Sequence, residues 1–203
     1  MIKNIIFDIG MVLVDFAWKA EMEELGFDKQ CIDVLDKNFV NSNLWDELDL
    51  GVLEESEVID MARKAIPEYA KEIDLFWENC IDTIRPFDYC EEWVRSLRES
   101  GFNVYLLTNY PDSLFEKSVK KSFPFYRYIN GEIVSSRIKC RKPDPFIYET
   151  LLKKYDLKPE ESIFTDDRII NVEAASKLGI KAVLFTSYEK TGSEIEQIIL
   201  ENR

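Results

Sequence analysis

The sequence contains no histidine at all. This absence excludes Ser-His-Asp and Cys-His catalysis, histidine zinc sites and haem ligation through histidine. The four cysteines, Cys31, Cys80, Cys90 and Cys140, are scattered and form no C-x-x-C pair. They therefore favour reduced thiols over a disulfide framework or a zinc site. Any chemistry must use carboxylates, lysine, hydroxyls or a hard metal ion.

Positive charge and long apolar runs are also scarce. The chain has 26 Lys and Arg against 39 Asp and Glu, a net charge of −13. Because this field repels nucleic acid and anionic membrane surfaces, we expect neither as a partner. No apolar run approaches the roughly 18 residues that span a bilayer, and the N-terminus does not resemble a signal peptide. Together with the reduced thiols, these features predict a cytoplasmic protein. We expect a monomer or weak dimer, a state that no pattern in the sequence specifies.

Short β-branched and aromatic runs predict strands, and helical patterns lie between them. The predicted strands are Lys3–Asp8, Asn103–Thr108, Glu132–Ser136, Ser162–Asp166 and Lys181–Thr186. Four of them are apolar nearly throughout, as expected for strands covered on both faces. The last helix is expected at about Gly192–Glu201. This alternation predicts an α/β fold with a doubly wound parallel sheet.

A long segment after the first strand interrupts the alternation. Residues 16–85 show helical patterns and no convincing strand, and Pro86 follows them. We interpret this segment as a small all-α cap, with residues 1–15 and 86–203 forming the catalytic core. Its tryptophans Trp18, Trp45 and Trp77, together with Phe16, form either a substrate-facing wall or, as is more common, the core of the helical segment.

Polar residues stand where the predicted strands end, which is where parallel sheets bind ligands. They are Asp8 after the first strand, Thr108 and Asn109 after the second, Asp166 and Asp167 after the fourth, and Lys142 just before the helix that leads into the fourth strand.

The chemistry of this set is coherent. Neighbouring carboxylates repel one another unless a cation joins them, and oxygen ligands favour Mg²⁺. One Mg²⁺ ligates at about 2.1 Å, so Asp8 and Asp167 must lie within about 8 Å of each other. Thr108, with the backbone N–H groups of the following helix, can hold phosphate oxygens, and Lys142 supplies positive charge. Asp8 can attack phosphorus and form an aspartyl-phosphate.

Four segments in this order, Asp8-Ile9-Gly10, Thr108-Asn109, Lys142-Pro143 and Asp166-Asp167, resemble the four motifs of the haloacid dehalogenase-like (HAD) hydrolase superfamily. The resemblance covers essentially the whole chain, and the helical insertion resembles the C1-type cap of subfamily I. Phe7–Asp15 and Leu50–Glu54 resemble the branch of α-D-glucose-1-phosphate phosphatases and the N-terminal phosphatase of soluble epoxide hydrolase. The resemblance implies a HAD-like Rossmannoid core and a Mg²⁺-dependent hydrolase of small phosphorylated metabolites, with sugar phosphates as the suggested class.

The resemblance also implies a role for each matching residue. Asp8 is the nucleophile and a metal ligand, and the backbone carbonyl of Gly10 and the side chain of Asp167 are further metal ligands. Asp166 is expected to contact the metal only indirectly. Lys142 is expected to act in catalysis and to bind phosphate together with Thr108 and Asn109.

Gly10 departs from the common pattern. Most phosphatases of the superfamily place a second Asp there, which protonates the leaving group, and such help is worth about 10²–10⁴-fold. Its absence predicts a slow enzyme, a substrate with a good leaving group, or another proton donor. Asp15 is the nearest alternative carboxylate, although solvation at the cap hinge suits it better. Met11 is a second departure, since Gly or Asn is usual at that position.

Three other functions remain open. Metal-independent 2-haloacid dehalogenases of the superfamily also attack with Asp, but they lack the acidic pair represented here by Asp166 and Asp167. Phosphoryl-transferring mutases rely on the second Asp, so Gly10 argues against them. A binding or regulatory protein with weakened catalysis is compatible with Gly10 and Met11.

Overall fold

The computed structural model describes residues 1–202, and its centre is a five-stranded sheet in the order β5-β4-β1-β6-β7. The strands are β1 (Asn4–Phe7), β4 (Asn103–Thr108), β5 (Gly131–Val134), β6 (Ser162–Asp166) and β7 (Lys181–Leu184). All neighbouring pairs are parallel. The chain builds the sheet outward from β1 in one direction and then in the other, which confirms the predicted doubly wound sheet.

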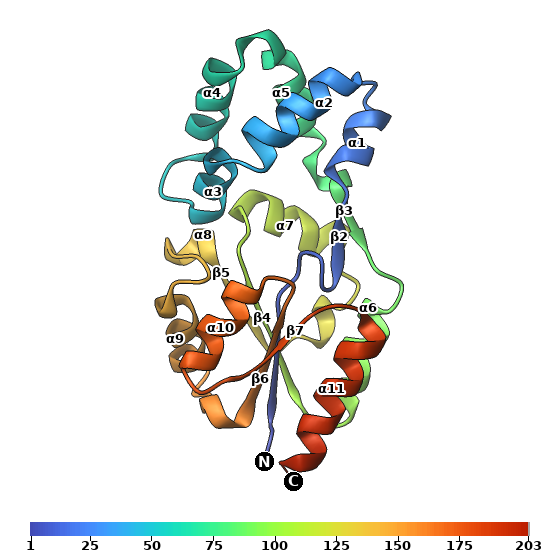
Figure 1. The fold of residues 1–203 in the computed structure, drawn as a ribbon, viewed down its shortest axis with the longest axis vertical. Helices are drawn as coiled ribbons and strands as arrows, with labels where there is room; N and C mark the ends of the chain where they lie inside the picture. The colour runs from blue at the N-terminus through green and yellow to red at the C-terminus, as the bar shows by residue number, and fades with distance from the viewer. Residues whose placement is uncertain (203) are drawn as a thin grey trace.

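Helices cover both faces of the sheet (Figure 1). They are α6 (Cys90–Glu99), α7 (Asp112–Lys121), α8 (Ser135–Ile138), α9 (Pro145–Lys154), α10 (Ile169–Lys177) and α11 (Tyr188–Glu201). Ile5 and Phe7 of β1 belong to the same buried cluster as Trp93 of α6, whereas Ile6 belongs to a second cluster with Ile147 of α9. Because successive side chains enter opposite clusters, β1 is apolar throughout.

The segment between Phe16 and Ile84 forms helices that lie beyond the carboxyl ends of the strands, at the top of Figure 1. They are α1 (Trp18–Glu24), α2 (Lys29–Leu35), a π-helical turn (Asp36–Val40), α3 (Asn43–Leu50), α4 (Glu55–Ala65) and α5 (Ala70–Glu78). Short 3₁₀ turns occur at Pro67–Tyr69, Cys80–Thr83, Tyr126–Tyr128 and Pro159–Glu161. The division at residues 16–85 into a separate cap stays a prediction.

The aromatic residues of this segment pack against one another. The ring centroid of Trp45 lies 5.1 Å from that of Phe16 and 6.1 Å from that of Trp77, and Trp18 lies 5.2 Å from Phe16. All four are half-buried and pack on the larger hydrophobic cluster. Their packing suits a core role in the helical segment, and the choice between this role and a substrate-facing wall stays a prediction.

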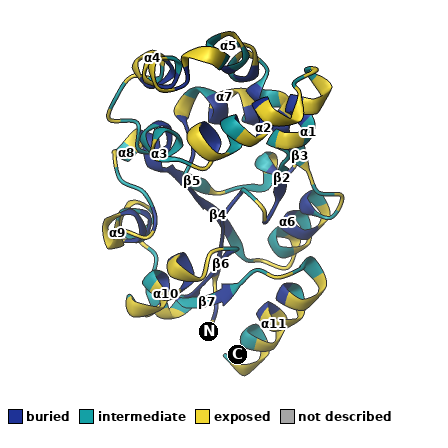
Figure 2. Cartoon of the chain, turned by 45° about the horizontal axis from the view of Figure 1, so that its top comes forward, coloured by how far each residue is buried: buried dark blue, intermediate teal, exposed yellow. Residues whose placement is uncertain are grey.

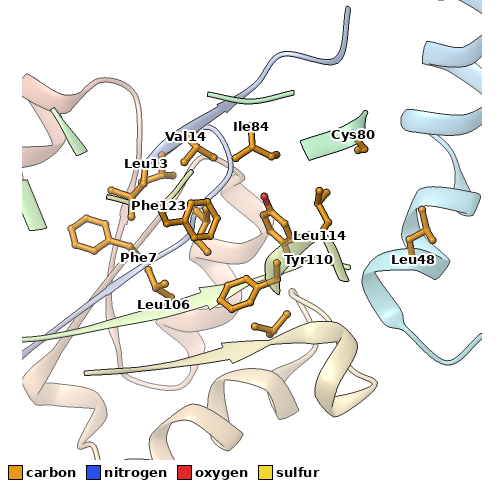
Figure 3. Close-up of a cluster of buried hydrophobic side chains, with 14 of the residues drawn as sticks. Phe7, Leu13, Val14, Leu48, Cys80, Ile84, Leu106, Tyr110, Leu114 and Phe123 are labelled. Atoms are coloured by element: carbon orange, nitrogen blue, oxygen red, sulfur yellow. The ribbon is translucent and has the colours of Figure 1, made fainter. Parts of the chain in front are cut away.

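A small antiparallel ribbon joins this segment to the sheet. In it β2 (Val14–Phe16) pairs with β3 (Ile84–Pro86), with Asp15 opposite Arg85. The sequence predicted no strand here, because three-residue strands are too short to show a periodic pattern. Figure 2 shows buried stretches in both the helical segment and the sheet. One cluster of buried side chains includes Phe7 of β1, Leu48 of α3 and Leu114 of α7, so the helical segment and the sheet share one core (Figure 3).

Several predicted boundaries were wrong. The first strand is Asn4–Phe7 rather than Lys3–Asp8, β5 begins at Gly131 rather than Glu132, and β7 ends at Leu184 rather than Thr186. The strand predicted to reach Ser136 ends at Val134, because Ser135 begins α8 and its hydroxyl donates to the backbone carbonyl of Asp49. The last helix begins at Tyr188 rather than Gly192, because the Ser187 side chain accepts a hydrogen bond from the backbone N–H of Lys190. Within residues 1–202, every helix is too short or too polar to cross a bilayer.

Candidate active site

The carboxyl ends of three adjacent strands bring the predicted site residues together. Asp8 follows β1 directly, Thr108 ends β4 and Asp166 ends β6. Since β1 lies between β4 and β6, Phe7 pairs with both Leu106 and Thr165 in parallel register. The backbone N–H of Asp8 donates to the carbonyl of Thr165 at 3.0 Å, which fixes the start of the loop that carries Asp8.

Three carboxylates form a cluster at this edge. Asp8, Asp166 and Asp167 each present an oxygen, and these oxygens lie within 4.8 Å of one another. This separation meets the 8 Å condition for a shared Mg²⁺. With all groups ionised, three carboxylates and the ammonium of Lys142 carry a net charge of −2. A divalent cation with oxygen preference fits both this charge and this donor set.

Lys142 lies at the centre of the cluster and is only 1% exposed. Its Nζ is 2.8 Å from Oδ1 of Asp8 and 2.7 Å from Oδ2 of Asp166. Burial alone lowers the pKa of Lys142, but the charges of Asp166 and Asp8 raise it above its ordinary value. The two ion pairs therefore favour the charged form of Lys142.

Asn109 positions Lys142. Its Oδ1 accepts the backbone N–H of Lys142 at 2.8 Å, and its Nδ2 donates to the Lys142 carbonyl at 3.1 Å. Both polar side-chain atoms are thus used in holding the lysine loop. A contact between Asn109 and phosphate, as the sequence suggested, stays a prediction.

Asp166 is fully buried and tightly bound by the protein. Besides Lys142, it accepts the backbone N–H of Arg168 at 2.8 Å and the side-chain amide of Asn171 at 2.9 and 3.0 Å. Asp167, the next residue, is the most exposed of the three carboxylates. The arrangement suits the expectation that Asp167 is a direct ligand and Asp166 an indirect one, which stays a prediction.

The carboxyl of Asp8 is held through one of its oxygens. Oδ1 accepts the backbone N–H of Ile9 at 2.7 Å and also faces Lys142. Burial raises the pKa of Asp8 to about 7, Lys142 opposes this effect, and the charge of Asp166 adds to it. Since a carboxylate attacks only when ionised, a neighbouring cation would favour the reactive form of Asp8.

Thr108 has an unsatisfied hydroxyl. Its Oγ1 is buried and has no hydrogen-bond partner among the described residues, an arrangement that costs about 1–3 kcal/mol. An anionic oxygen placed beside it would remove this cost. By contrast, the amides around the start of α7 are not all free to bind phosphate. Tyr110 N–H donates to Ser135 Oγ at 2.9 Å, and Ser113 N–H donates to Glu55 Oε1 at 3.1 Å.

Packing of the loop after Asp8 does not account for Gly10 or Met11, the two departures from the common family pattern. A Cβ added at Gly10 would meet no atom within 4 Å, so the position has room for a larger side chain. Met11 adopts a left-handed backbone with φ of 58° and is exposed. Coordination of a metal by the Gly10 carbonyl stays a prediction.

Asp49 is a buried acid that sequence reasoning did not single out. It lies on α3, and its Oδ1 has no hydrogen-bond partner among residues 1–202. Burial raises its pKa to about 8, with Arg141 lowering it and the charges of Asp46 and Asp8 raising it. The only sequence signal is the i, i+3 spacing of Asp46 and Asp49, which is also typical of a solvated helix face.

A carboxylate cluster beyond the carboxyl ends of a doubly wound parallel sheet is the arrangement of an α/β enzyme. The sequence profile of the haloacid dehalogenase-like hydrolases matches residues 2–179. The chain therefore belongs to this family of hydrolases, as its four motifs predicted.

Two relatives cover nearly the whole chain. It is 27% identical over 203 residues to the sesquiterpene phosphatase astK of Aspergillus oryzae, with 97% of this chain and 96% of the relative aligned. It is 28% identical over 192 residues to a D-ribitol-5-phosphate phosphatase of Bacteroides thetaiotaomicron, with 89% and 90% aligned. A HAD family enzyme from Bacteroides thetaiotaomicron, crystallised with magnesium and inorganic phosphate, has a TM-score of 0.75 at 25% identity over 93% of this chain and 96% of that chain.

Proposed function

We propose that this chain is a Mg²⁺-dependent phosphomonoesterase that hydrolyses a small phosphorylated metabolite through an aspartyl-phosphate on Asp8. The observation that carries the proposal is the buried cluster in which Lys142 contacts Asp8 and Asp166 while Asp167 completes a set of carboxylates within 4.8 Å. Phosphoryl transfer needs mainly positioning and charge neutralisation, and this cluster supplies the groups for both.

The donor set suits Mg²⁺ rather than a softer metal. The three side chains offer only carboxylate oxygens, and the chain has no histidine. When bound, Mg²⁺ would neutralise the carboxylates and polarise the phosphoryl oxygens. Asp8 and Asp167 are the proposed side-chain ligands, with the Gly10 carbonyl as the backbone ligand. The structural relative crystallised with magnesium and inorganic phosphate supports Mg²⁺ as the metal.

The chain's own residues then divide the work. Lys142 and the unsatisfied hydroxyl of Thr108 hold phosphoryl oxygens, and the contacts of Asn109 fix the lysine. Asp8 attacks phosphorus as the alcohol departs, and water later hydrolyses the aspartyl-phosphate. Asp166, bound by Asn171 and Arg168, orients Lys142.

The substrate is proposed as the phosphate ester of an uncharged alcohol. With a net charge of −13, the protein accepts an anion only where local groups such as Lys142 and Thr108 receive it. Sugar and polyol phosphates are the first class to test, supported by the ribitol-phosphate relative. Prenyl phosphates are the second class, because the sesquiterpene phosphatase is similarly related.

A phosphate-release assay tests the proposal. Wild type and the Asp8→Asn variant are compared on p-nitrophenyl phosphate and on a panel of sugar, polyol and prenyl phosphates, with Mg²⁺ or with EDTA. We expect hydrolysis by wild type that EDTA abolishes and magnesium restores, and none by Asp8→Asn. Turnover of a 2-haloacid unaffected by EDTA would indicate a dehalogenase instead. A folded wild type inactive on the entire panel would favour a binding protein.

A further inference from the structure

The proposed reaction needs a proton for the departing oxygen, and Gly10 offers no side chain to supply it. Three nearby groups are unsuited to the task. Lys142 is occupied by Asp8 and Asp166, and Asp166 by Lys142, Arg168 and Asn171. Asp15 lies in the β2–β3 ribbon opposite Arg85, in the connection between the sheet and α1 rather than at a strand end of the main sheet.

Asp49 reaches the same edge of the sheet from the helical segment. The backbone carbonyl of Asp49 accepts a hydrogen bond from the Ser135 hydroxyl. The same hydroxyl oxygen accepts a hydrogen bond from the backbone N–H of Tyr110, two residues after Thr108. One turn earlier on α3, Asp46 forms a two-point ion pair with Arg141, the neighbour of Lys142. The i, i+3 spacing places Asp49 on the helix face that carries Asp46.

The carboxyl group of Asp49 has no structural task of its own. It is 9% exposed, and its Oδ1 is unpartnered within the described chain. A buried polar atom without a hydrogen-bond partner destabilises the fold, so its retention calls for an explanation. The charged groups that act on it are Arg141 and Asp46 beside it and Asp8 and Lys142 of the site.

We propose that Asp49 is the general acid and base of this enzyme, taking over from α3 the role of the missing second Asp. The assignment rests on the proposed phosphatase function. It adds a catalytic residue that comes from the helical segment rather than from the loop after β1.

The two steps balance as follows. In the first, Asp8 forms a bond to phosphorus as the bond to the leaving oxygen breaks, and the proton of the Asp49 carboxyl passes to that oxygen. The alcohol departs and Asp49 becomes a carboxylate. In the second, Asp49 takes a proton from water as that water attacks phosphorus, the bond to Asp8 breaks, and inorganic phosphate is released. Both aspartates return to their starting forms.

The environment of Asp49 favours this cycle. Burial raises the pKa of its carboxyl to about 8, so the group is protonated at neutral pH. A general acid is most effective when its pKa lies near the working pH. Asp8 contacts the Lys142 ammonium at 2.8 Å, whereas Asp49 forms no ion pair within the described residues, and this difference in contacts assigns attack to Asp8 and proton transfer to Asp49.

Leaving-group dependence tests the proposal. Phenyl phosphate releases an alcohol of pKa about 10, which needs a proton, whereas p-nitrophenyl phosphate releases a far more acidic phenol that does not. Wild type, Asp49→Asn and the matched control Asp46→Asn are compared on both esters with Mg²⁺. We expect Asp49→Asn to lose about 10²-fold or more in kcat on phenyl phosphate and less than about 10-fold on p-nitrophenyl phosphate. Asp46→Asn should change both rates by the same factor.

A second variant provides a gain of function. A Cβ added at Gly10 would meet no atom within 4 Å, so the position can accept an aspartate. The double variant Gly10→Asp, Asp49→Asn should therefore hydrolyse phenyl phosphate at least about 10-fold faster than Asp49→Asn alone. Equal losses on both esters, or a changed ratio in Asp46→Asn, would overturn the Asp49 assignment while leaving the phosphatase proposal intact. A folded wild type inactive on both esters and on the panel of sugar, polyol and prenyl phosphates would contradict the phosphatase proposal itself and this assignment with it.

Discussion

Replacing Lys142 by methionine tests the electrostatic balance of the site. The side chain is 1% exposed and contacts two carboxylates at 2.8 and 2.7 Å. Methionine fills much the same space but carries no charge, so Lys142→Met leaves Asp8 and Asp166 facing each other without compensation. Removing one partner of a buried ion pair typically costs about 3–5 kcal/mol.

The cost should depend on pH, because Asp8 without its ammonium partner can take up a proton. Burial already raises the pKa of Asp8, and loss of the Lys142 charge raises it further above that of the unfolded chain, where the group is ionised above about pH 4. Folding then binds extra protons, so the stability of the variant falls as pH rises. Each extra proton contributes about 1.4 kcal/mol per pH unit. We expect a loss near 3–5 kcal/mol at pH 8 that is smaller by about 1–3 kcal/mol at pH 6, without Mg²⁺.

Urea unfolding followed by tryptophan fluorescence at both pH values measures this difference. Lys29→Met is the matched control, since Lys29 also pairs with an aspartate, Asp33 at 2.7 Å, but on the exposed surface of α2. Its unfolding midpoint should match that of wild type. A loss below about 1 kcal/mol for Lys142→Met at pH 8, or a loss that does not change with pH, would refute the account of the buried ion pairs.

Two further predictions concern α3 and its contacts. Asp49→Asn should gain stability relative to wild type as pH rises from about 4 to 8. Burial raises the folded pKa of Asp49 to about 8, so wild type loses the stability contributed by the protonated carboxyl over that range, whereas the variant does not. Urea unfolding at pH 5 and 8 should show a relative shift of at least about 1 kcal/mol, and parallel pH profiles would contradict the burial of this acid. Gly51→Ala should lower Tm by about 5 °C or more, because Gly51 has φ of 64° and an added Cβ would lie 2.7 Å from Cβ of Ser136. Thermal unfolding measures this change. An unchanged Tm would contradict the close contact between Gly51, at the end of α3, and α8.

The sequence predicted the part of the site that strand order creates. Asp8, Thr108 and Asp166 stand directly at the ends of apolar runs, and parallel strands bring such ends to one edge. Lys142 was predicted from its motif, yet its contact with Asp166 follows from the path of the loop before α9. These residues are specified locally, by the position at which each strand or helix stops.

Contacts set by tertiary packing could not be predicted. The residues that neighbour Asp49 in the sequence do not distinguish it from a solvated acid. Its burial results from the packing of α3 against α8, where Asp49 contacts Ser135, 86 residues away. Similarly, the side chain of Asn109 was expected on phosphate, but its amide matches the main chain of Lys142, 33 residues away. The β2–β3 ribbon was missed because three residues carry too little pattern.

The central claim is that Asp8 carries the phosphoryl group during turnover. Wild type is mixed with Mg²⁺ and a phosphate ester that it hydrolyses, then quenched in acid and digested. The Asp8-containing peptide should carry the added mass of one phosphoryl group, and fragmentation should place that mass on Asp8. The Asp8→Asn variant should yield only the unmodified peptide and no free phosphate. Phosphate release by a wild type whose Asp8 peptide stays unmodified, together with turnover by Asp8→Asn, would contradict the account.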